Sequence, residues 1–140
     1  MFIIGERINP AGKPALSRAI REGAQTCIQK EALSQARAGA QALDVNVYLP
    51  HLDRTSAMKF AVKAVRAVTQ LPLAIDDQDP DVVEAGLQGA GDENFINSPI
   101  DAERDKRKFF SLAKRFRARM LILPMKRGRI PKDPKTHIEV

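Results

Sequence analysis

Polar side chains stand at the ends of several short apolar segments in this 140-residue chain. Asp76 closes the segment 72–76, and Asn97 lies near the end of the segment 93–98. A carboxylate accepts two N–H donors side by side, whereas a carboxamide both donates and accepts hydrogen bonds. If these segments are neighbouring buried strands, Asp76 and Asn97 face one pocket and suit a flat heterocycle with an amidine-like edge, such as a guanine or a pterin. Other polar residues at comparable positions are Glu6, Arg7, Asn9, Asp44, Asn46, Asp77, Gln78, Asp79 and Ser98.

The acidic run 76–81 also allows structural interpretations. Asp79 precedes Pro80 and is expected to cap a helix. Asp77 is either a solvated loop residue or a partner of Asp76 in a divalent-metal site, because hard cations bind clustered carboxylates. The run lacks the spacing of a calcium-binding loop, so we predict no metal here.

Asp44 and Asn46 alternate with apolar neighbours, as do residues on one face of a strand. They are either residues of the site or partners of Glu6 or Arg7 inside the sheet. Each buried polar group left without a hydrogen bond costs about 1–3 kcal/mol, so these side chains must find partners.

Few residues suit covalent or zinc chemistry. Cys27 is the only cysteine, which excludes an internal disulfide and a cysteine-based zinc site. It lies in a helical pattern with no histidine nearby in sequence, so we expect a small core residue rather than a nucleophile. His51 and His137 stand in polar contexts and are expected at the surface.

The composition is that of an ordinary globular protein, with 44% hydrophobic and 29% charged residues. This balance excludes a disordered tail or a fibrous repeat. The apolar runs are too short to span a membrane, and Glu6 comes too early for a secretory signal. We therefore expect a cytoplasmic protein with one domain, residues 1–140.

The charge is unevenly distributed along the chain. Residues 1–103 carry 14 acidic and 10 basic side chains, whereas residues 104–140 carry 3 acidic and 13 basic ones. Such a basic region could bind nucleic acid. Its aromatic residues Phe109, Phe110 and Phe116, however, have the spacing of a buried helix face rather than of a base-stacking surface. We therefore expect a solvated helix face, with nucleic-acid binding as the less favoured alternative.

The hydrophobic pattern alternates between strand and helix. Strands are expected at 2–5, 42–47, 72–76, 93–98 and 119–124. Helices are expected at 15–38 with a possible interruption at Gly23, at 55–68, at 80–87, and from a cap at Asp101 to about 116, with loop or a helix stub at 126–140.

Such alternation predicts an α/β fold with a parallel sheet and right-handed crossovers. Two architectures fit the pattern. An open doubly wound sheet would be complete at this length, whereas a (β/α)8 barrel needs about 250 residues. Periodicity alone leaves both open.

Six segments, taken in order, resemble the pterin-binding family of (β/α)8 barrels, and within it the methyltetrahydrofolate:corrinoid methyltransferases and the folate modules of cobalamin-dependent methionine synthases. They cover nearly the whole chain. The segments are Gly5-Glu6-Arg7-Ile8-Asn9-Pro10, Gly39-Ala40 with Leu43-Asp44-Val45-Asn46-Val47, Pro72-Leu73-Ala74-Ile75-Asp76, Glu84-Ala85-Gly86-Leu87, Ile96-Asn97-Ser98 and Ile130-Pro131-Lys132.

This resemblance implies a parallel (β/α) TIM-barrel type of fold, truncated to about five strands and four helices. It implies methyltetrahydrofolate as the substrate, with the N5 methyl group passing to cobalamin that a separate corrinoid protein carries. Asp76 matches the aspartate that holds the pyrimidine edge, and Asn97 matches the asparagine beside it. The pterin-binding residues implied by the resemblance are Asp44, Asn46, Asp76, Asn97, Asn9 and Ser98.

The sequence also departs from the family pattern. Asp77 stands where the family has serine, and Lys126 and Arg127 replace acidic residues. The segments for strands six to eight, which carry the family's residue at N5, have no counterpart in this sequence, so no catalytic residue is assigned. An open half-barrel exposes strand edges and apolar side chains, so we expect a homo-oligomer or a partner chain that completes the barrel. A non-catalytic pterin-binding module remains the alternative to an enzyme.

Overall fold

A five-stranded parallel sheet forms the centre of the computed structural model, which describes residues 1–97 and 103–122. The strand order follows the chain, β1-β2-β3-β4-β5. The strands are β1 (Ile4–Ile8), β2 (Ala42–Asn46), β3 (Leu73–Asp76), β4 (Phe95–Asn97) and β5 (Arg119–Leu121). The helices are α1 (Pro14–Glu22), α2 (Gln25–Arg37), α3 (Arg54–Arg66), α4 (Pro80–Ala90) and α5 (Glu103–Phe116).

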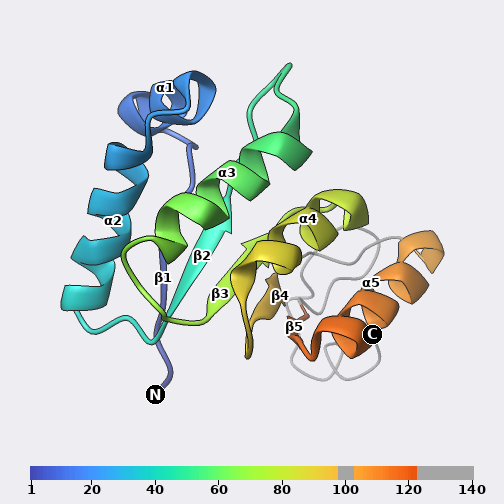
Figure 1. Cartoon of the computed structure of the whole chain (residues 1–140). Coiled ribbons are helices and arrows are strands. Elements are labelled where there is room, and N and C mark those ends of the chain that lie inside the picture. The colour runs from blue at the N-terminus through green and yellow to red at the C-terminus, as the bar shows by residue number, and fades with distance from the viewer. Residues whose placement is uncertain (98–102, 123–140) are drawn as a thin grey trace, which may run out of the picture.

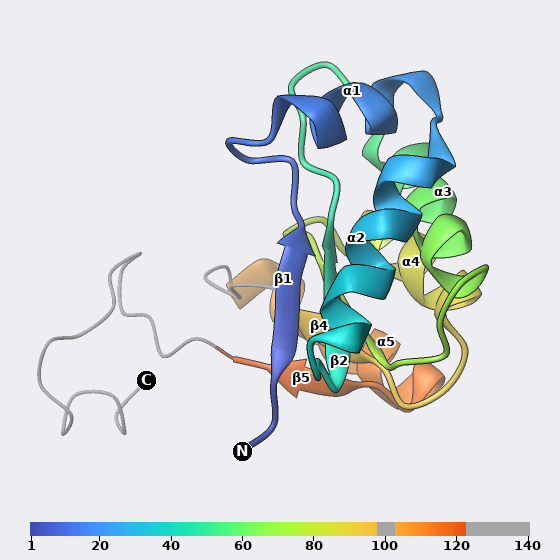
Figure 2. The same ribbon diagram turned by 90° about the vertical axis from the view of Figure 1, so that its left-hand side faces the viewer.

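The strand order decides between the two architectures. A doubly wound sheet reverses its strand order and carries helices on both faces. Here the order never reverses, and α2, α3 and α4 lie together on one side of the strands (Figures 1 and 2). This is the arrangement of a (β/α) barrel, so the predicted α/β fold of TIM-barrel type is confirmed.

The two faces of the sheet have different chemistry. The face under the helices belongs to the main core, which contains fully buried Leu43, Leu73 and Ile75. The opposite face, called the inner face below, has a small separate apolar cluster made of Ala42, Ala74 and Phe95. Because side chains alternate between the faces of a strand, every second residue after this cluster also lies on the inner face.

The first strand is longer than predicted and begins further along the sequence. It runs over Ile4–Ile8 rather than 2–5, because Ile8 is fully buried in the core while Phe2 is 50% exposed. Gly5 lies against α2, where a Cβ atom would come within 2.5 Å of the Gln35 Oε1 atom. The same Gln35 oxygen accepts a hydrogen bond of 2.8 Å from the Arg7 backbone N–H. The close approach at Gly5 therefore fixes β1 against its helix.

The predicted helix 15–38 is two helices, which makes five helices instead of four among the described residues. Gly23 ends α1 in the left-handed region, with φ of 69°, and the backbone N–H of Ala24 bonds to the Ala19 carbonyl at 2.8 Å. Glycine adopts this conformation without a Cβ penalty, so the break anticipated at Gly23 is complete.

Aspartate side chains cap α3 and α4, and the cap of α4 was predicted from the sequence. The Asp53 side chain accepts bonds from the backbone N–H groups of Thr55 and Ser56 and starts α3. The Asp79 side chain accepts from the Asp81 N–H, which confirms the predicted cap of α4. This helix continues to Ala90, beyond the predicted end at 87.

Helices α4 and α5 pack on the core, and in α5 the burial of the phenylalanine side chains differs from the prediction. In α4, a Cβ at Gly86 would come within 2.7 Å of Ile75, so the helix lies directly on the sheet. In α5, Phe109 is buried but Phe110 is 55% exposed, against the prediction of a buried face that includes both. Arg115 of α5 forms an ion pair with Glu84, which covers part of the basic surface.

Some predictions fall on residues that the structure does not describe. They are the helix cap at Asp101, the site residue Ser98, His137, and the segment 126–140. Within residues 1–97 and 103–122, no helix has the length and apolarity needed to cross a membrane.

Candidate functional site

The polar residues at the strand ends meet on the inner face of the sheet. Asn46 of β2 is in register with Asp76 of β3, which is in register with Asn97 of β4. Residues paired across parallel strands share a face, so the three side chains lie side by side at the carboxyl end of the sheet. Asp44 lies on the same face, two residues before Asn46. The predicted adjacency of Asp76 and Asn97 is therefore present in the backbone register.

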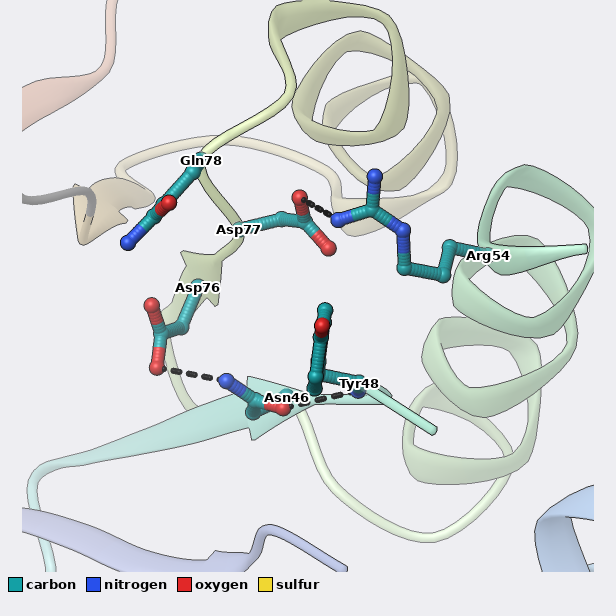
Figure 3. A pocket seen from close by; sticks show the side chains of 6 residues that line it. All are labelled: Asn46, Tyr48, Arg54, Asp76, Asp77 and Gln78. Carbon is teal, nitrogen blue, oxygen red and sulfur yellow. Dashed lines mark hydrogen bonds and ion pairs between the residues drawn. The ribbon is translucent and has the colours of Figure 1, made fainter. Parts of the chain in front are cut away.

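One asparagine–aspartate pair joins β2 to β3. The Asn46 Nδ2 atom donates to Asp76 Oδ2 at 2.9 Å, and Asn46 Oδ1 accepts from the backbone N–H of Tyr48 at 2.8 Å. Figure 3 shows both bonds. Asn46 therefore holds the carboxylate of Asp76 in place. The second oxygen, Asp76 Oδ1, has no hydrogen-bond partner within the described residues, and it is available to a ligand.

A second pair crosses from β4 to β2. The Asn97 Nδ2 atom donates to Asp44 Oδ1 at 2.8 Å, over the top of the intervening strand β3. The residue of β3 in register with Asp44 is Ala74, whose small side chain leaves room for this bond. Asp44 and Asn46 thus pair with Asn97 and Asp76, not with Glu6 or Arg7 as the alternative interpretation held.

A pocket of about 400 Å³ opens beside the first pair. In Figure 3 the Asp76 side chain points toward Asn46, while that of Asp77 points away from it, toward Arg54. The residues that line the pocket are Asn46, Tyr48, Arg54, Asp76, Asp77 and Gln78.

Asp77 is neither a solvated loop residue nor paired with Asp76 in a metal site, the two interpretations that the sequence allowed. It is 4% exposed rather than solvated, and its Oδ1 atom pairs with the Arg54 guanidinium at 2.6 Å and accepts the Asp79 backbone N–H at 2.8 Å. The part of the chain that the structure describes contains no cluster of acidic, histidine or cysteine residues able to hold a metal. An internal ion pair therefore explains Asp77.

Tyr48 and Arg54 belong to the site but were not predicted from the sequence. The Arg54 guanidinium carbon lies 5.5 Å from the centre of the Tyr48 ring, and Tyr48 is 63% exposed. Tyr48 belongs to the connection from β2 to α3, at the carboxyl end of the sheet, and Arg54 is the first residue of α3. Ligand-binding residues of (β/α) barrels come from such connections, so the position of Tyr48 just after Asn46 was the available signal.

The site is electrostatically acidic. The pKa of Asp44 is raised to about 7, mainly by burial and also by the nearby carboxylates of Asp76 and Glu6, against the lowering effect of the bond from Asn97. Burial likewise raises the pKa of Asp76, against the stabilising bond from Asn46. Because acidic groups outnumber cations here, the site favours a ligand edge that offers N–H donors.

Asn9 contacts the predicted site only indirectly. Its Nδ2 atom donates to Glu6 Oε1 at 2.6 Å, and its Oδ1 atom accepts from the Ala11 N–H at 3.0 Å, so it orders the loop after β1. Glu6 in turn acts on the pKa values of Asp44 and Asp76. The structure brings Asp44, Asn46, Asp76 and Asn97 together, and places Asn9 behind Glu6.

A parallel sheet of (β/α) type with polar pairs at its carboxyl end is the arrangement found at the ligand-binding end of (β/α) barrels. Comparison with known proteins gives the family: residues 5–139 match the model for pterin-binding enzymes, and the chain belongs to that family. This confirms the family resemblance found in the sequence.

A curated relative is the methylcorrinoid:tetrahydrofolate methyltransferase of Eubacterium limosum. The two sequences are 32% identical over 106 residues, which is 76% of this chain and 38% of the relative. The matched part of this chain therefore spans much less than two thirds of the relative's length.

Proposed function

We propose that this chain binds the pterin ring of a reduced folate and takes part in the transfer of the N5 methyl group between methyltetrahydrofolate and a corrinoid protein. Membership in the pterin-binding family supports the ligand class. The activity for which the Eubacterium limosum relative is named supports methyl transfer between a corrinoid and a folate.

One observation carries the binding proposal. Asp76 Oδ2 is held by Asn46 Nδ2 at 2.9 Å, while Asp76 Oδ1 has no hydrogen-bond partner among the described residues. A carboxylate fixed in this way accepts N–H donors from the pyrimidine edge of a pterin without losing rotational freedom on binding. Asn97, in register with Asp76, provides the adjacent polar group.

The methyl transfer needs N5 to leave as a neutral amine, which a proton on N5 favours. We assign no residue of the described chain to that proton. Cobalamin supplies the methyl-carrying metal centre when the corrinoid partner binds, and the role proposed for this chain is to hold the folate. A non-catalytic pterin-binding module would share the binding step but lack the transfer.

Isothermal titration with methyltetrahydrofolate tests the binding step. Asp76→Ala is expected to lower the affinity about 10- to 100-fold, because hydrogen bonds to a charged group contribute about 1.5–3 kcal/mol. Asp92→Ala removes the same charge from an exposed position after α4 and serves as the matched control. Equal affinity of Asp76→Ala and wild type would refute the assignment of the pocket.

A second assay separates an enzyme from a binding module. Cob(I)alamin is added to the chain loaded with methyltetrahydrofolate, and methylcobalamin is followed by its absorbance. Binding together with methylcobalamin formation supports the transferase. Binding without transfer supports the module.

We also propose that a second polypeptide, either another copy or a chain completing the barrel, covers the inner face. Strands β1 and β5 each have one neighbour among the described strands, and Phe2, whose ring packs against Phe95 of the inner face, is 50% exposed. Open edges and exposed apolar side chains promote association. Analytical ultracentrifugation over a range of concentrations is expected to show species larger than a monomer, and a monomer at all concentrations would contradict the proposal.

A further inference from the structure

Asp44 is a buried carboxyl group on the inner face and is only half satisfied. It is 1% exposed, and its Oδ1 atom accepts the bond of 2.8 Å from Asn97 Nδ2. Its Oδ2 atom is buried and has no hydrogen-bond partner within the described residues. Leaving a buried polar atom in this state costs about 1–3 kcal/mol, so the position calls for a role beyond holding the sheet together.

The groups around Asp44 favour its neutral form near physiological pH. Burial raises the pKa of Asp44, Asp76 on β3 and Glu6 on β1 add to this effect, and the Asn97 bond lowers it, so that the pKa is about 7. Arg119 is the charged residue that β5 places in register with Phe95, and its guanidinium lies 5.6 Å from the centre of that ring. Both protonation states of Asp44 are therefore populated close to neutral pH.

The protonation state of Asp44 determines how Asn97 can be oriented. An ionised carboxylate only accepts hydrogen bonds, so the amide of Asn97 must turn its NH2 group toward Asp44. The carbonyl oxygen of Asn97 is then left without a partner among the described residues, beside Asp76. A protonated Asp44 can donate instead, which permits the amide to rotate by about 180° and direct its NH2 group away from Asp44.

We propose that Asp44 is a positioning residue that sets, through Asn97, whether the site offers its ligand a hydrogen-bond acceptor or a donor. This inference rests on the proposed function, because the ligand is the pterin ring held by Asp76. With Asp44 ionised, Asn97 Oδ1 and Asp76 Oδ1 present two neighbouring acceptors to the N–H donors of the pyrimidine edge. Uptake of one proton from solvent by Asp44 replaces one acceptor with a donor, which repels such an edge.

The first test needs no ligand. The side-chain amide resonances of Asn97 are followed by 15N NMR between pH 5.5 and 8.5 in the wild-type chain. They are expected to shift with a midpoint near the pKa of Asp44, about 7, and to show no such transition in Asp44→Asn. Amide resonances of Asn97 that do not change with pH in the wild type would overturn the inference, whether or not the variant folds.

The second test uses methyltetrahydrofolate as the probe. Wild-type affinity is expected to fall about tenfold for each pH unit below the midpoint, down to the affinity of the protonated form. In Asp44→Asn this dependence is expected to disappear between pH 6 and 8, because position 44 no longer titrates. An Asp44→Asn variant that retains the wild-type pH profile would refute the role of Asp44.

The two proposals fail in different ways. If Asp76→Ala binds methyltetrahydrofolate as tightly as wild type, the pterin site is wrong, although the NMR titration of Asn97 still reports on Asp44. If Asp76→Ala abolishes binding but Asn97 does not respond to pH, the pterin site holds and the inference about Asp44 is wrong.

Discussion

Two asparagines lie at opposite ends of the same strand: Asn94 is buried and Asn97 is half-buried, and they make different numbers of hydrogen bonds. Asn94 precedes β4 and is 2% exposed, with its Oδ1 atom accepting from the Leu73 N–H at 2.8 Å and its Nδ2 atom donating to the Gly91 carbonyl at 2.7 Å. Asn97 ends β4 and makes one described side-chain bond, to Asp44. Saturated bonding at the amino end indicates a structural role, and unsaturated bonding at the carboxyl end indicates a binding role.

The cations near the two ends have different partners. Arg66 lies near Asn94 and donates to the backbone carbonyls of Leu71 and Ala90 as well as to Asn94 Oδ1. Arg54, at the other end, pairs with Asp77 but also lines the pocket beside the exposed ring of Tyr48. Among the described residues, the asparagine at the amino end therefore has partners for both its oxygen and its nitrogen, whereas the oxygen of the asparagine at the carboxyl end has none.

The largest expected effect is a loss of stability when Asn94, at the amino end of β4, is replaced. Asn94→Ala leaves the Leu73 N–H and the Gly91 carbonyl without their partner, and each buried unsatisfied group costs about 1–3 kcal/mol. We expect the free energy of unfolding in urea to drop by about 2–4 kcal/mol. The folate affinity of the molecules that remain folded should stay at the wild-type value.

Asn97→Ala is the matched counterpart. It removes one described side-chain bond, so the stability change is expected to be the smaller of the two, while folate affinity falls by about tenfold, the equivalent of about 1.4 kcal/mol. If Asn97→Ala destabilised the fold more than Asn94→Ala and left binding intact, the contrast between the two ends would be reversed.

The second effect concerns stability and pH. The pKa of Asp44 is raised to about 7 in the folded chain, mainly by burial, whereas an unfolded aspartate has a pKa of about 3.9. Between these values the folded state binds more protons than the unfolded state, so the contribution of Asp44 to stability is full below pH 4 and declines as pH rises to 7. Each pKa unit of difference contributes about 1.4 kcal/mol.

Urea unfolding at pH 4, 5.5, 7 and 8 measures this contribution. Relative to Asp44→Asn, the wild type is expected to lose stability progressively from pH 4 to 7 and then to change little. Asp81→Asn, on the exposed first turn of α4, is the control and should follow the wild-type profile. Parallel profiles for wild type and Asp44→Asn would show that burial does not hold Asp44 in its neutral form.

The sequence predicted the parts of the fold that depend on local pattern. The five strands and the cap at Asp79 follow from hydrophobic period and from residues with marked backbone preferences, whereas Gly23 was expected only as a possible interruption of one helix and in fact ends α1. The register of β1 did not follow, because it depends on the close contact of Gly5 with Gln35 of α2, which lies 30 residues further along the chain.

The site was predicted in its composition but not in its pairing. Asp44, Asn46, Asp76 and Asn97 stood out as polar residues in apolar segments. Their partners, however, are set by strand order and register, since Asn97 reaches Asp44 across β3 and past Ala74. Tyr48 and Arg54 were missed because an exposed tyrosine and the first residue of a helix have no distinctive local pattern.

The smallest expected effect is that of Glu6, on β1, on the pKa of Asp44. Glu6 raises the pKa of Asp44, but its effect is smaller than that of burial and that of Asp76. Glu6→Gln removes the charge and keeps an oxygen for the bond from Asn9 Nδ2. The midpoint of the Asn97 amide titration is therefore expected to move down by less than about one pH unit, because burial still raises the pKa of Asp44 above its usual range.

Glu22→Gln provides the control, since Glu22 is exposed at the end of α1 and is not among the groups that shift Asp44. If the midpoint of the Asn97 titration moves down in Glu6→Gln but not in Glu22→Gln, the charge of Glu6 acts on Asp44. An unchanged midpoint would mean that solvent screens Glu6 from Asp44. The carboxyl groups that interact at this end of the sheet would then be those of Asp44 on β2 and Asp76 on β3.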